Sequence, residues 1–402
     1  MVPSMSLLVL AALTPDTHDL EIIDENTSPI NDFSRADLVG ITCTVDTFDR
    51  ARTIASRFRA SGTPVIMGGI FPSACPEIAG QASDSVCVGY AEPLWADILA
   101  DAQKGSLQKL YRCSDVSDLR MVPHPKWDAI SRTRYLYTNV VTTSRGCPHQ
   151  CDFCYNSCEY VPRRYLRRPV DSTVREIEQL DTKQVMFVDD NFIGNTTWLD
   201  EFLTAIAPLD LTWHAAVSAD IGNKLPLLDK MQETGCHSLF IGFESINQAS
   251  IAGVMKRQNR VVQYERTIQE IHSRGIMVNA SMVFGFDQDT SDVFDDTLQW
   301  LVNNRVETMT AHILTPYPGT MLHTRLEKEG RITDRNLSHY NTSHVVYRPA
   351  LMSPDELLDG YLNIYKDFYS ARNIVRRMPE SRDRWFPYLL FNLGWDIGSS
   401  AQ

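Results

Sequence analysis

The chain has 402 residues, 43% hydrophobic and 22% charged, so it is long enough for two domains with buried cores. A formal net charge of -12 argues against broad electrostatic binding to nucleic acid or anionic lipid. We therefore expect a small-molecule substrate and no nucleic-acid or membrane partner. The apolar run Leu7–Leu13 is too short to span a bilayer and no Lys or Arg precedes it, which predicts a cytoplasmic protein.

Short apolar runs alternate with amphipathic stretches in the first part of the chain, which is typical of a parallel sheet covered by helices. The expected strands are Leu20–Asp24, Leu38–Cys43, Pro64–Gly69 and Ser85–Gly89. We therefore predict an α/β fold whose first domain, residues 1–105, is a Rossmann-like layer. Residues 106–136 contain scattered Pro, Ser and Arg without a sustained period and are expected to be a linker.

The alternation of strand and helix patterns restarts after this linker. The expected strands are Asn139–Thr143, Val185–Asp189, Thr212–Ser218, Ser238–Phe243, Met277–Phe284 and Thr308–Leu314. This succession predicts a partial (β/α)6 TIM-like barrel over residues 137–335, with its chemistry at the carboxyl ends of the strands. Residues 336–402 are expected to be a helical extension, with an amphipathic helix over Asp355–Tyr369 and an aromatic closing segment over Trp385–Trp395.

Three cysteines are crowded behind the first barrel strand, where the sequence CPHQCDFC supplies Cys147, Cys151 and Cys154. Three thiolates can each bind one iron of a cubane cluster and leave the fourth iron open to a ligand. A zinc site completed by His149 or Cys158 is the alternative. Structural zinc sites, however, pair two short cysteine spacings at a distance, and this sequence has no second pair.

The CxxxCxxC spacing, with an aromatic residue before the last cysteine and a strand–helix repeat behind it, resembles the radical SAM superfamily. The resemblance implies that Cys147, Cys151 and Cys154 are the catalytic centre and hold a [4Fe-4S] cluster whose open iron binds S-adenosylmethionine. One-electron reduction, by a donor such as flavodoxin or ferredoxin, then breaks a carbon–sulfur bond and normally yields a 5′-deoxyadenosyl radical. Phe153 is expected to lie against the adenine.

The ends of the second and third barrel strands carry further candidate cofactor-binding residues. Asp189 and Asp190 stand where the superfamily usually has a Gly-Gly-Glu element that meets the methionine ammonium, and their carboxylates can accept the same hydrogen bonds. Either aspartate can take that role. Ser218 ends the third strand. A carboxylate at a strand end is also often a helix N-cap, and that structural role stays open for Asp190.

Later strand ends continue this pattern of polar residues and glycine. Glu244 and Ser245 resemble a superfamily segment near the sulfonium and ribose, although Glu244 too is a candidate helix cap. Gly285 ends the fifth strand, where a glycine lets the backbone approach adenine closely. Residues 316–320, Pro-Tyr-Pro-Gly-Thr, are expected to shape the substrate side or to form a rigid turn.

Three further features have both a functional and a structural interpretation. Cys158 is a radical-relay thiol, a spare ligand or, more often in such contexts, a buried structural cysteine. His214 either faces the barrel lumen or is a hydrogen-bonded core histidine. The arginines at positions 163, 164, 167 and 168 either hold a phosphate or carboxylate or form a solvated loop.

The first domain, together with this barrel, resembles the cobalamin-binding branch of the superfamily, in which strand-end loops cradle a corrin. The corresponding loops here contain Val39–Thr42, Gly68–Pro72 and Val88–Glu92. Two features depart from the branch: the chain begins at what resembles the first helix, and no Asp-x-His-x-x-Gly element supplies an axial histidine. We therefore expect a vestigial, structural cobalamin-type domain with an exposed sheet edge, and treat cobalamin as a doubtful cofactor.

Three enzymatic functions follow from these resemblances. The leading one is radical modification of a small molecule of the natural-product type. The second is cobalamin-dependent methyl transfer to carbon or phosphorus, which consumes two molecules of S-adenosylmethionine per turnover. The third is transfer of the 3-amino-3-carboxypropyl group of S-adenosylmethionine. A zinc-stabilised binding module is the non-enzymatic alternative, and it predicts zinc without iron.

Overall fold

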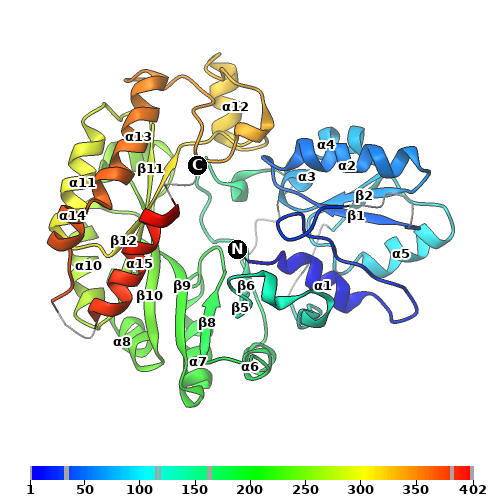
Figure 1. The fold of residues 1–402 in the computed structure, drawn as a ribbon, viewed down its shortest axis with the longest axis horizontal. Helices are drawn as coiled ribbons and strands as arrows, with labels where there is room; N and C mark the ends of the chain where they lie inside the picture. Colours follow the sequence, from blue (N-terminus) through cyan, green and yellow to red (C-terminus); the bar gives the residue numbers. More distant parts are fainter. Residues whose placement is uncertain are drawn as a thin grey trace.

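The computed structural model describes residues 2–398, except for 31–35, 114, 115, 117, 118, 160, 162–164 and 381–383. An N-terminal α/β layer and a larger barrel-like domain lie side by side, and C-terminal helices pack on the barrel (Figure 1). The α/β fold predicted from the sequence is therefore confirmed. None of the described helices is long and apolar enough to cross a membrane.

The N-terminal layer is a parallel sheet of four strands in the order β1-β2-β3-β4. Its elements are α1 Met5–Leu13, β1 Val39–Thr42, α2 Phe48–Ala60, β2 Val65–Gly68, α3 Ile70–Ala74, α4 Pro76–Ala82, β3 Ser85–Val88, α5 Trp95–Gln103 and β4 Leu110–Arg112. The central strands β2 and β3 are almost entirely buried, because helices cover both faces of a parallel sheet.

Two expectations for this part of the chain are wrong. The segment Leu20–Asp24 is irregular, and Leu20 is 41% exposed. A strand needs a neighbour for its backbone hydrogen bonds, and within the described residues β1 pairs only with β2, so no strand stands beside β1 to receive this segment. Leu110–Arg112, placed in the linker, instead forms strand β4 against β3.

The barrel sheet has six parallel strands in the order β12-β11-β10-β9-β8-β5. Their bounds are β5 Val140–Val141, β8 Gln184–Phe187, β9 Thr212–Ser218, β10 Cys236–Glu244, β11 Met277–Phe284 and β12 Thr308–Ile313. The six strands predicted for the barrel are all present, and β9 and β11 have the predicted bounds. A short antiparallel ribbon, β6 Ser144–Arg145 with β7 Leu166–Arg167, brackets the cysteine segment.

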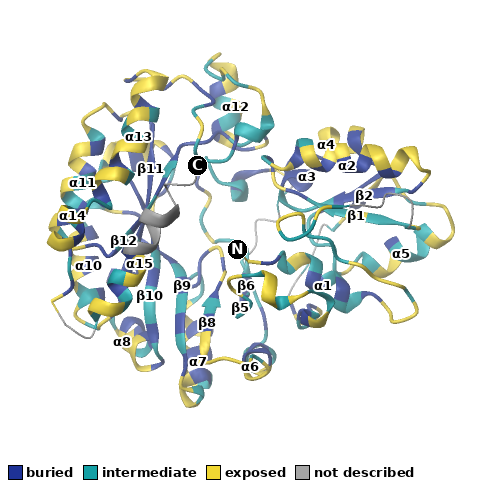
Figure 2. Cartoon of the chain, in the orientation of Figure 1, coloured by how far each residue is buried: buried dark blue, intermediate teal, exposed yellow. Residues whose placement is uncertain are grey.

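Helices alternate with the barrel strands and form its outer layer, so that the strand ends of the sheet share one rim. Their bounds are α6 Val170–Glu178, α7 Thr196–Ile206, α8 Leu225–Glu233, α9 Gln248–Gly253, α10 Tyr264–His272, α11 Val293–Asn303 and α12 Met321–Lys328. Most of their inward positions are buried, whereas exposed residues line the outside (Figure 2).

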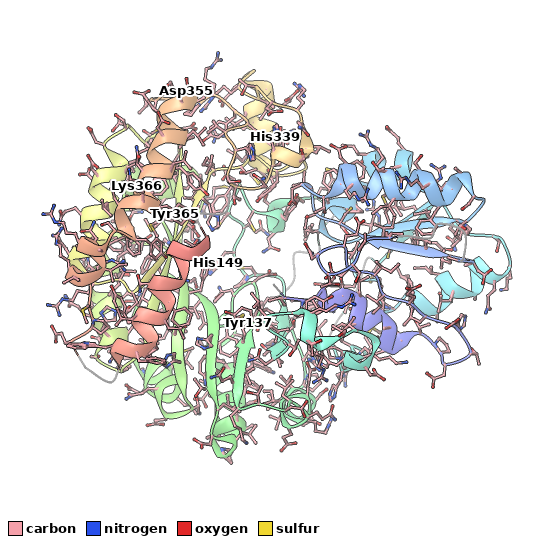
Figure 3. The ribbon with its side chains drawn as sticks, viewed as in Figure 1. Tyr137, His149, His339, Asp355, Tyr365 and Lys366 are labelled. Carbon is pink, nitrogen blue, oxygen red and sulfur yellow. The ribbon has the colours of Figure 1, made fainter. Side chains whose placement is uncertain are left out.

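The C-terminal extension consists of α13 Pro354–Phe368, α14 Ala371–Arg376 and α15 Trp385–Gly398. A capping box between Ser353 and Glu356 starts α13. Tyr365, labelled in Figure 3, donates its hydroxyl to the carbonyl of Ala311 at 2.9 Å, and Tyr369 donates to the carbonyl of Met309 at 2.7 Å. Both carbonyls belong to β12, so α13 covers the edge of the barrel sheet.

Candidate active site

The cysteine segment is tied to the barrel through Asp152, which lies between the second and third thiols. The Asp152 N–H donates to the carbonyl of Val254 at 3.2 Å, and the Asp152 carbonyl accepts from the Leu322 N–H at 3.0 Å. Cys147, Cys151 and Cys154 are free thiols. Among the described residues no three His, Cys, Asp or Glu side chains converge on one ion, as a zinc site requires. An iron–sulfur cubane does not need the three thiolates to meet at one ion, because each thiolate binds a different iron of the cluster.

Asp189 holds the start of this segment. Its carboxylate accepts hydrogen bonds from the Thr143 N–H at 2.9 Å, from the Thr143 hydroxyl at 3.2 Å, and from the N–H and hydroxyl of Ser144. Asp190 is exposed toward the strand ends and accepts one bond, from the Gly146 N–H at 3.1 Å. Of the two aspartates, Asp190 therefore has the carboxylate with capacity left for a ligand.

Two side-chain amides approach the cysteine sulfurs. The Nδ2 atom of Asn191 is 3.9 Å from the Cys147 Sγ, and the Nε2 atom of Gln258 is 3.9 Å from the Cys151 Sγ. Asn191 also donates to the Ser218 hydroxyl at 3.3 Å, which places Ser218 beside the segment. Hydrogen bonds to cluster-ligating sulfurs help to set reduction potentials, so both amides are placed to tune a bound cluster.

A buried ion pair between Glu244 and Lys256 lies beside the thiols. Glu244 ends β10 with φ +65°, a left-handed conformation that costs roughly 1–3 kcal/mol for a residue other than glycine. Burial raises the pKa of the Cys151 thiol, and the Lys256 ammonium opposes that shift. Ser245, next in sequence, is buried and its hydroxyl accepts from the Asn247 N–H at 3.0 Å.

Gly285 has φ +101°, and the space that its missing side chain leaves is filled by protein. A Cβ there would overlap the Tyr347 hydroxyl and approach Leu357 to 2.8 Å. Asp289 accepts from the Gly285 N–H at 3.0 Å and fixes the loop. Glycine is thus required here by packing against the C-terminal extension, which supplies a structural reason for the residue independent of adenine.

Phe153 and Cys158 differ in their surroundings. The Phe153 ring meets the edge of Phe286, with centroids 6.3 Å apart, at the end of β11. Cys158 is fully buried in the main core, and burial raises the pKa of its thiol to about 12. A neutral, packed thiol supports the structural interpretation of Cys158.

His214 is a hydrogen-bonded histidine in the barrel wall. Its Nδ1 lies 2.6 Å from the Ser238 hydroxyl, and burial lowers its pKa to about 4. Arg168, between β7 and α6, is buried with Glu176 of α6 at 2.5 Å and donates to the carbonyl of Thr142 at 3.1 Å, so it links α6 to the residue that follows β5. The predicted basic residues at positions 163 and 164 lie outside the described part of the chain.

The N-terminal domain touches the cysteine segment directly. Arg145, two residues before Cys147, forms an ion pair with Glu92 and lies 5.2 Å from the ring centre of Tyr90. Tyr90 and Glu92 belong to the loop that follows β3, so the strand-end edge of the first sheet faces the barrel rim. His149, between the first two cysteines, is half-buried and is labelled near the middle of the view in Figure 3.

The first domain lacks an imidazole donor for cobalt at that edge. Between residues 19 and 123 the sequence contains no histidine. His18 lies 3.1 Å from Gln103, the last residue of α5. Because α5 starts near the carboxyl end of β3 and runs back, Gln103 and His18 are at the opposite end of the sheet from the barrel. The donor set therefore does not fit a corrin with a protein imidazole ligand.

Several site residues were missed by sequence reasoning. Lys256 and Gln258 come from a segment without a periodic or strand-end signal, whereas Glu92 was predicted to lie in a strand-end loop but not to contact the cysteine segment. Arg145 directly precedes the cysteine motif, and that proximity was the available signal. These residues meet only because separate strand–helix units and the first domain converge on one rim.

The chain is similar in sequence to known protein families and to several curated proteins. The radical SAM superfamily matches residues 141–301, and a domain of unknown function, DUF4070, matches residues 320–386. Bacteriochlorophyllide d C-12(1)-methyltransferase of Chlorobaculum tepidum is 27% identical, over 96% of this chain and 87% of that protein. Hopanoid C-2 methylase of Rhodopseudomonas palustris is 25% identical, over 98% of this chain and 80% of that protein.

Solved structures share the fold of about three quarters of this chain. TsrM of Kitasatospora setae, a radical S-adenosylmethionine methyltransferase with cobalamin and a [4Fe-4S] cluster bound, superposes with a TM-score of 0.59 at 17% identity, covering 74% of this chain and 68% of its own. OxsB, a cobalamin-dependent S-adenosylmethionine radical enzyme, gives a TM-score of 0.56 at 18% identity, covering 73% of this chain and 47% of its own. At these identities the likeness shows a common fold.

Proposed function

The chain is a radical SAM enzyme that resembles the cobalamin-binding branch of the superfamily, and on that premise we propose that it is a C-methyltransferase acting on an apolar small molecule. The observation that carries this proposal is the near full-length similarity to enzymes named as methyltransferases at carbon positions of a bacteriochlorophyllide and a hopanoid. The second function drawn from the sequence is thereby favoured over the other two.

The cysteine thiolates and the residues around them have distinct proposed roles. Cys147, Cys151 and Cys154 hold the [4Fe-4S] cluster, which supplies one electron to S-adenosylmethionine when bound. Asp190 accepts hydrogen bonds from the methionine ammonium, while Asp189 keeps the segment in place through Thr143 and Ser144.

Further proposed contacts come from the later strand ends. Phe153 and the Gly285 backbone face the adenine. Ser218, Glu244 and Ser245 lie toward the ribose, and Lys256 balances the Glu244 charge. Burial around these groups excludes water from the place where a reactive radical would form.

We also propose that the methyl carrier is cobalamin, bound at the strand-end edge that faces the barrel rim and lacking a histidine ligand from residues 19–123. The contact of Glu92 and Tyr90 with Arg145 supports a functional junction at this edge, rather than a vestigial domain remote from the chemistry. Electron paramagnetic resonance of the cobalt(II) form tests the ligand, because a coordinated nitrogen from protein imidazole or from the cofactor's own base gives an additional splitting. A splitting that changes when only the protein carries nitrogen-15 would refute this assignment.

The reaction is tested anaerobically with reconstituted protein, cobalamin, reductant, a bacteriochlorophyllide or hopanoid acceptor, and S-adenosylmethionine carrying a deuterated methyl group. The balance is two molecules of S-adenosylmethionine and two electrons per methylated product. One becomes S-adenosylhomocysteine; the other becomes methionine and 5′-deoxyadenosine, which takes the hydrogen from the substrate carbon. We expect the two nucleoside products in a one-to-one ratio and the label in a bacteriochlorophyllide-like or hopanoid-like product.

Transfer of the 3-amino-3-carboxypropyl group instead produces methylthioadenosine, so detection of that nucleoside would overturn methyl transfer. Cys151→Ala serves as the negative control, because it removes one of the three proposed cluster ligands. We expect loss of the cluster absorbance and of both nucleoside products in this variant. The Cys158→Ala variant is the matched control and should keep both, since Cys158 lies in the core.

A further inference from the structure

The last two helices are held firmly on the barrel by a buried arginine. Arg377 is fully buried and donates to the carbonyls of Val306 and Glu307, each at 2.8 Å. It also reaches Asn392 of α15 at 3.1 Å. The Tyr388 hydroxyl in α15 donates to the carbonyl of Ile374 in α14 at 2.7 Å. The outer faces of α14 and α15 are therefore fixed relative to each other and to the barrel.

These outer faces present large apolar side chains to solvent. Phe386 is 77% exposed, Leu390 is 64% exposed and Val375 is 67% exposed. Phe386 and Leu390 are four residues apart and so share one face of α15. Trp385 and Phe391 add further partly exposed rings to the same helix. Single exposed apolar residues are ordinary, but this group on two adjoining helices marks an interaction surface.

The charge around this surface is opposite to that of the whole chain. Residues 372–384 contain five arginines and two acidic residues, although the formal net charge of the protein is -12. Of these arginines, Arg377 is buried, Arg384 donates to the carbonyl of His272, and position 382 lies outside the described residues. Arg372 and Arg376 of α14 are exposed. The acidic Glu380 is paired with Arg305 at 2.6 Å, so its charge is balanced. Exposed apolar side chains and exposed arginines thus occur on two helices that are hydrogen-bonded to each other, and these residue types match the boundary layer of an anionic bilayer.

We propose that the α14–α15 face, defined by Val375, Phe386, Leu390, Arg372 and Arg376, docks on the surface of an anionic lipid bilayer. The side chains of Phe386 and Leu390 enter the acyl boundary, and the two arginines face lipid phosphates. This revises the expectation from net charge, because attraction to a membrane surface depends on local charge within the short screening distance. The proposal is independent of methyl transfer.

Vesicle sedimentation with the full chain tests the proposal, using phosphatidylglycerol–phosphatidylethanolamine vesicles and pure phosphatidylcholine vesicles. We expect binding to the anionic vesicles that weakens with salt. The Phe386→Ser/Leu390→Ser variant should bind about tenfold more weakly or worse, because each side chain loses transfer energy to an apolar medium. Arg372→Gln/Arg376→Gln should weaken binding by about fivefold per charge removed.

Val262→Ser provides the matched control, since Val262 is an equally exposed apolar residue on another part of the barrel. It should leave vesicle binding unchanged. Absence of binding to anionic vesicles, or equal binding by the Phe386→Ser/Leu390→Ser variant, would overturn the proposal. Sedimentation velocity without lipid provides a second measurement: a dimer that dissociates in this same variant would assign the face to a second copy of the chain, and thus also refute a lipid surface.

Discussion

Removing the Lys256 ammonium is the perturbation for which the structure gives the clearest magnitude. The side chains of Lys256 and Glu244 are 9% and 10% exposed, and their ion pair lies beside the cysteine segment. In Lys256→Met, the Glu244 carboxylate keeps, among the described residues, a single hydrogen-bond donor, the Ser281 hydroxyl at 3.4 Å. Removing one partner of a buried pair typically costs about 3–5 kcal/mol, because it strands a charge away from water.

The double variant Glu244→Gln/Lys256→Met separates this charge effect from loss of packing. Without either charge, it should recover about 2 kcal/mol or more of the stability lost in Lys256→Met, as expected for coupled neighbours. The free energy of unfolding is measured by urea denaturation of the protein without cluster, under anaerobic conditions and followed by tryptophan fluorescence.

An exposed ion pair of the same chain supplies the control. Arg175 and Asp171 are 2.9 Å apart on α6 and largely solvated. Arg175→Met should therefore change the free energy of unfolding by less than about 0.5 kcal/mol. The reasoning would be refuted by a Lys256→Met variant as stable as the native protein, or by a double variant that simply adds the two single losses.

Three further substitutions have outcomes that follow from the structure. Asp189→Ala removes the acceptor of four hydrogen bonds, so it should cost about 3 kcal/mol in urea unfolding and lower the iron retained after reconstitution, whereas an unchanged iron content would contradict its anchoring role. The pKa of His214 is about 4 in the folded protein and near 6.5 in the unfolded chain, so between these pH values the unfolded chain binds more protons. The free energy of unfolding should therefore fall by up to roughly 3 kcal/mol as the pH drops from 6.5 to 4. His214→Gln should flatten that part of the pH profile of stability. Gly360→Ala places a methyl group within 2.4 Å of three ring atoms of Phe294, so it should lower the thermal midpoint at a cost of about 1–3 kcal/mol. Gly253→Ala, with no atom within 4 Å of the added methyl group, should leave the midpoint unchanged.

The sequence by itself was sufficient for the barrel strands and for the cysteine segment. Strands β9 and β11 have the predicted bounds, because their apolar runs are long and end at polar or glycine residues. The three cysteines are close in sequence, so their joint location needs no long-range contact. Local periodicity and spacing also predicted α13, whose amphipathic pattern and capping box are contained within the helix itself.

Only the tertiary structure decided which residues surround the thiols and which segments become strands. The Leu20–Asp24 run has a strand-like composition but remains irregular, since strand formation depends on a neighbour that the described sheet does not provide. Arg145 meets Glu92 across two domains, and Tyr365 covers a strand 54 residues away. Such contacts depend on how the strand–helix units pack in space. Two residues that become neighbours in this way have no repeating pattern in the sequence that would predict the contact.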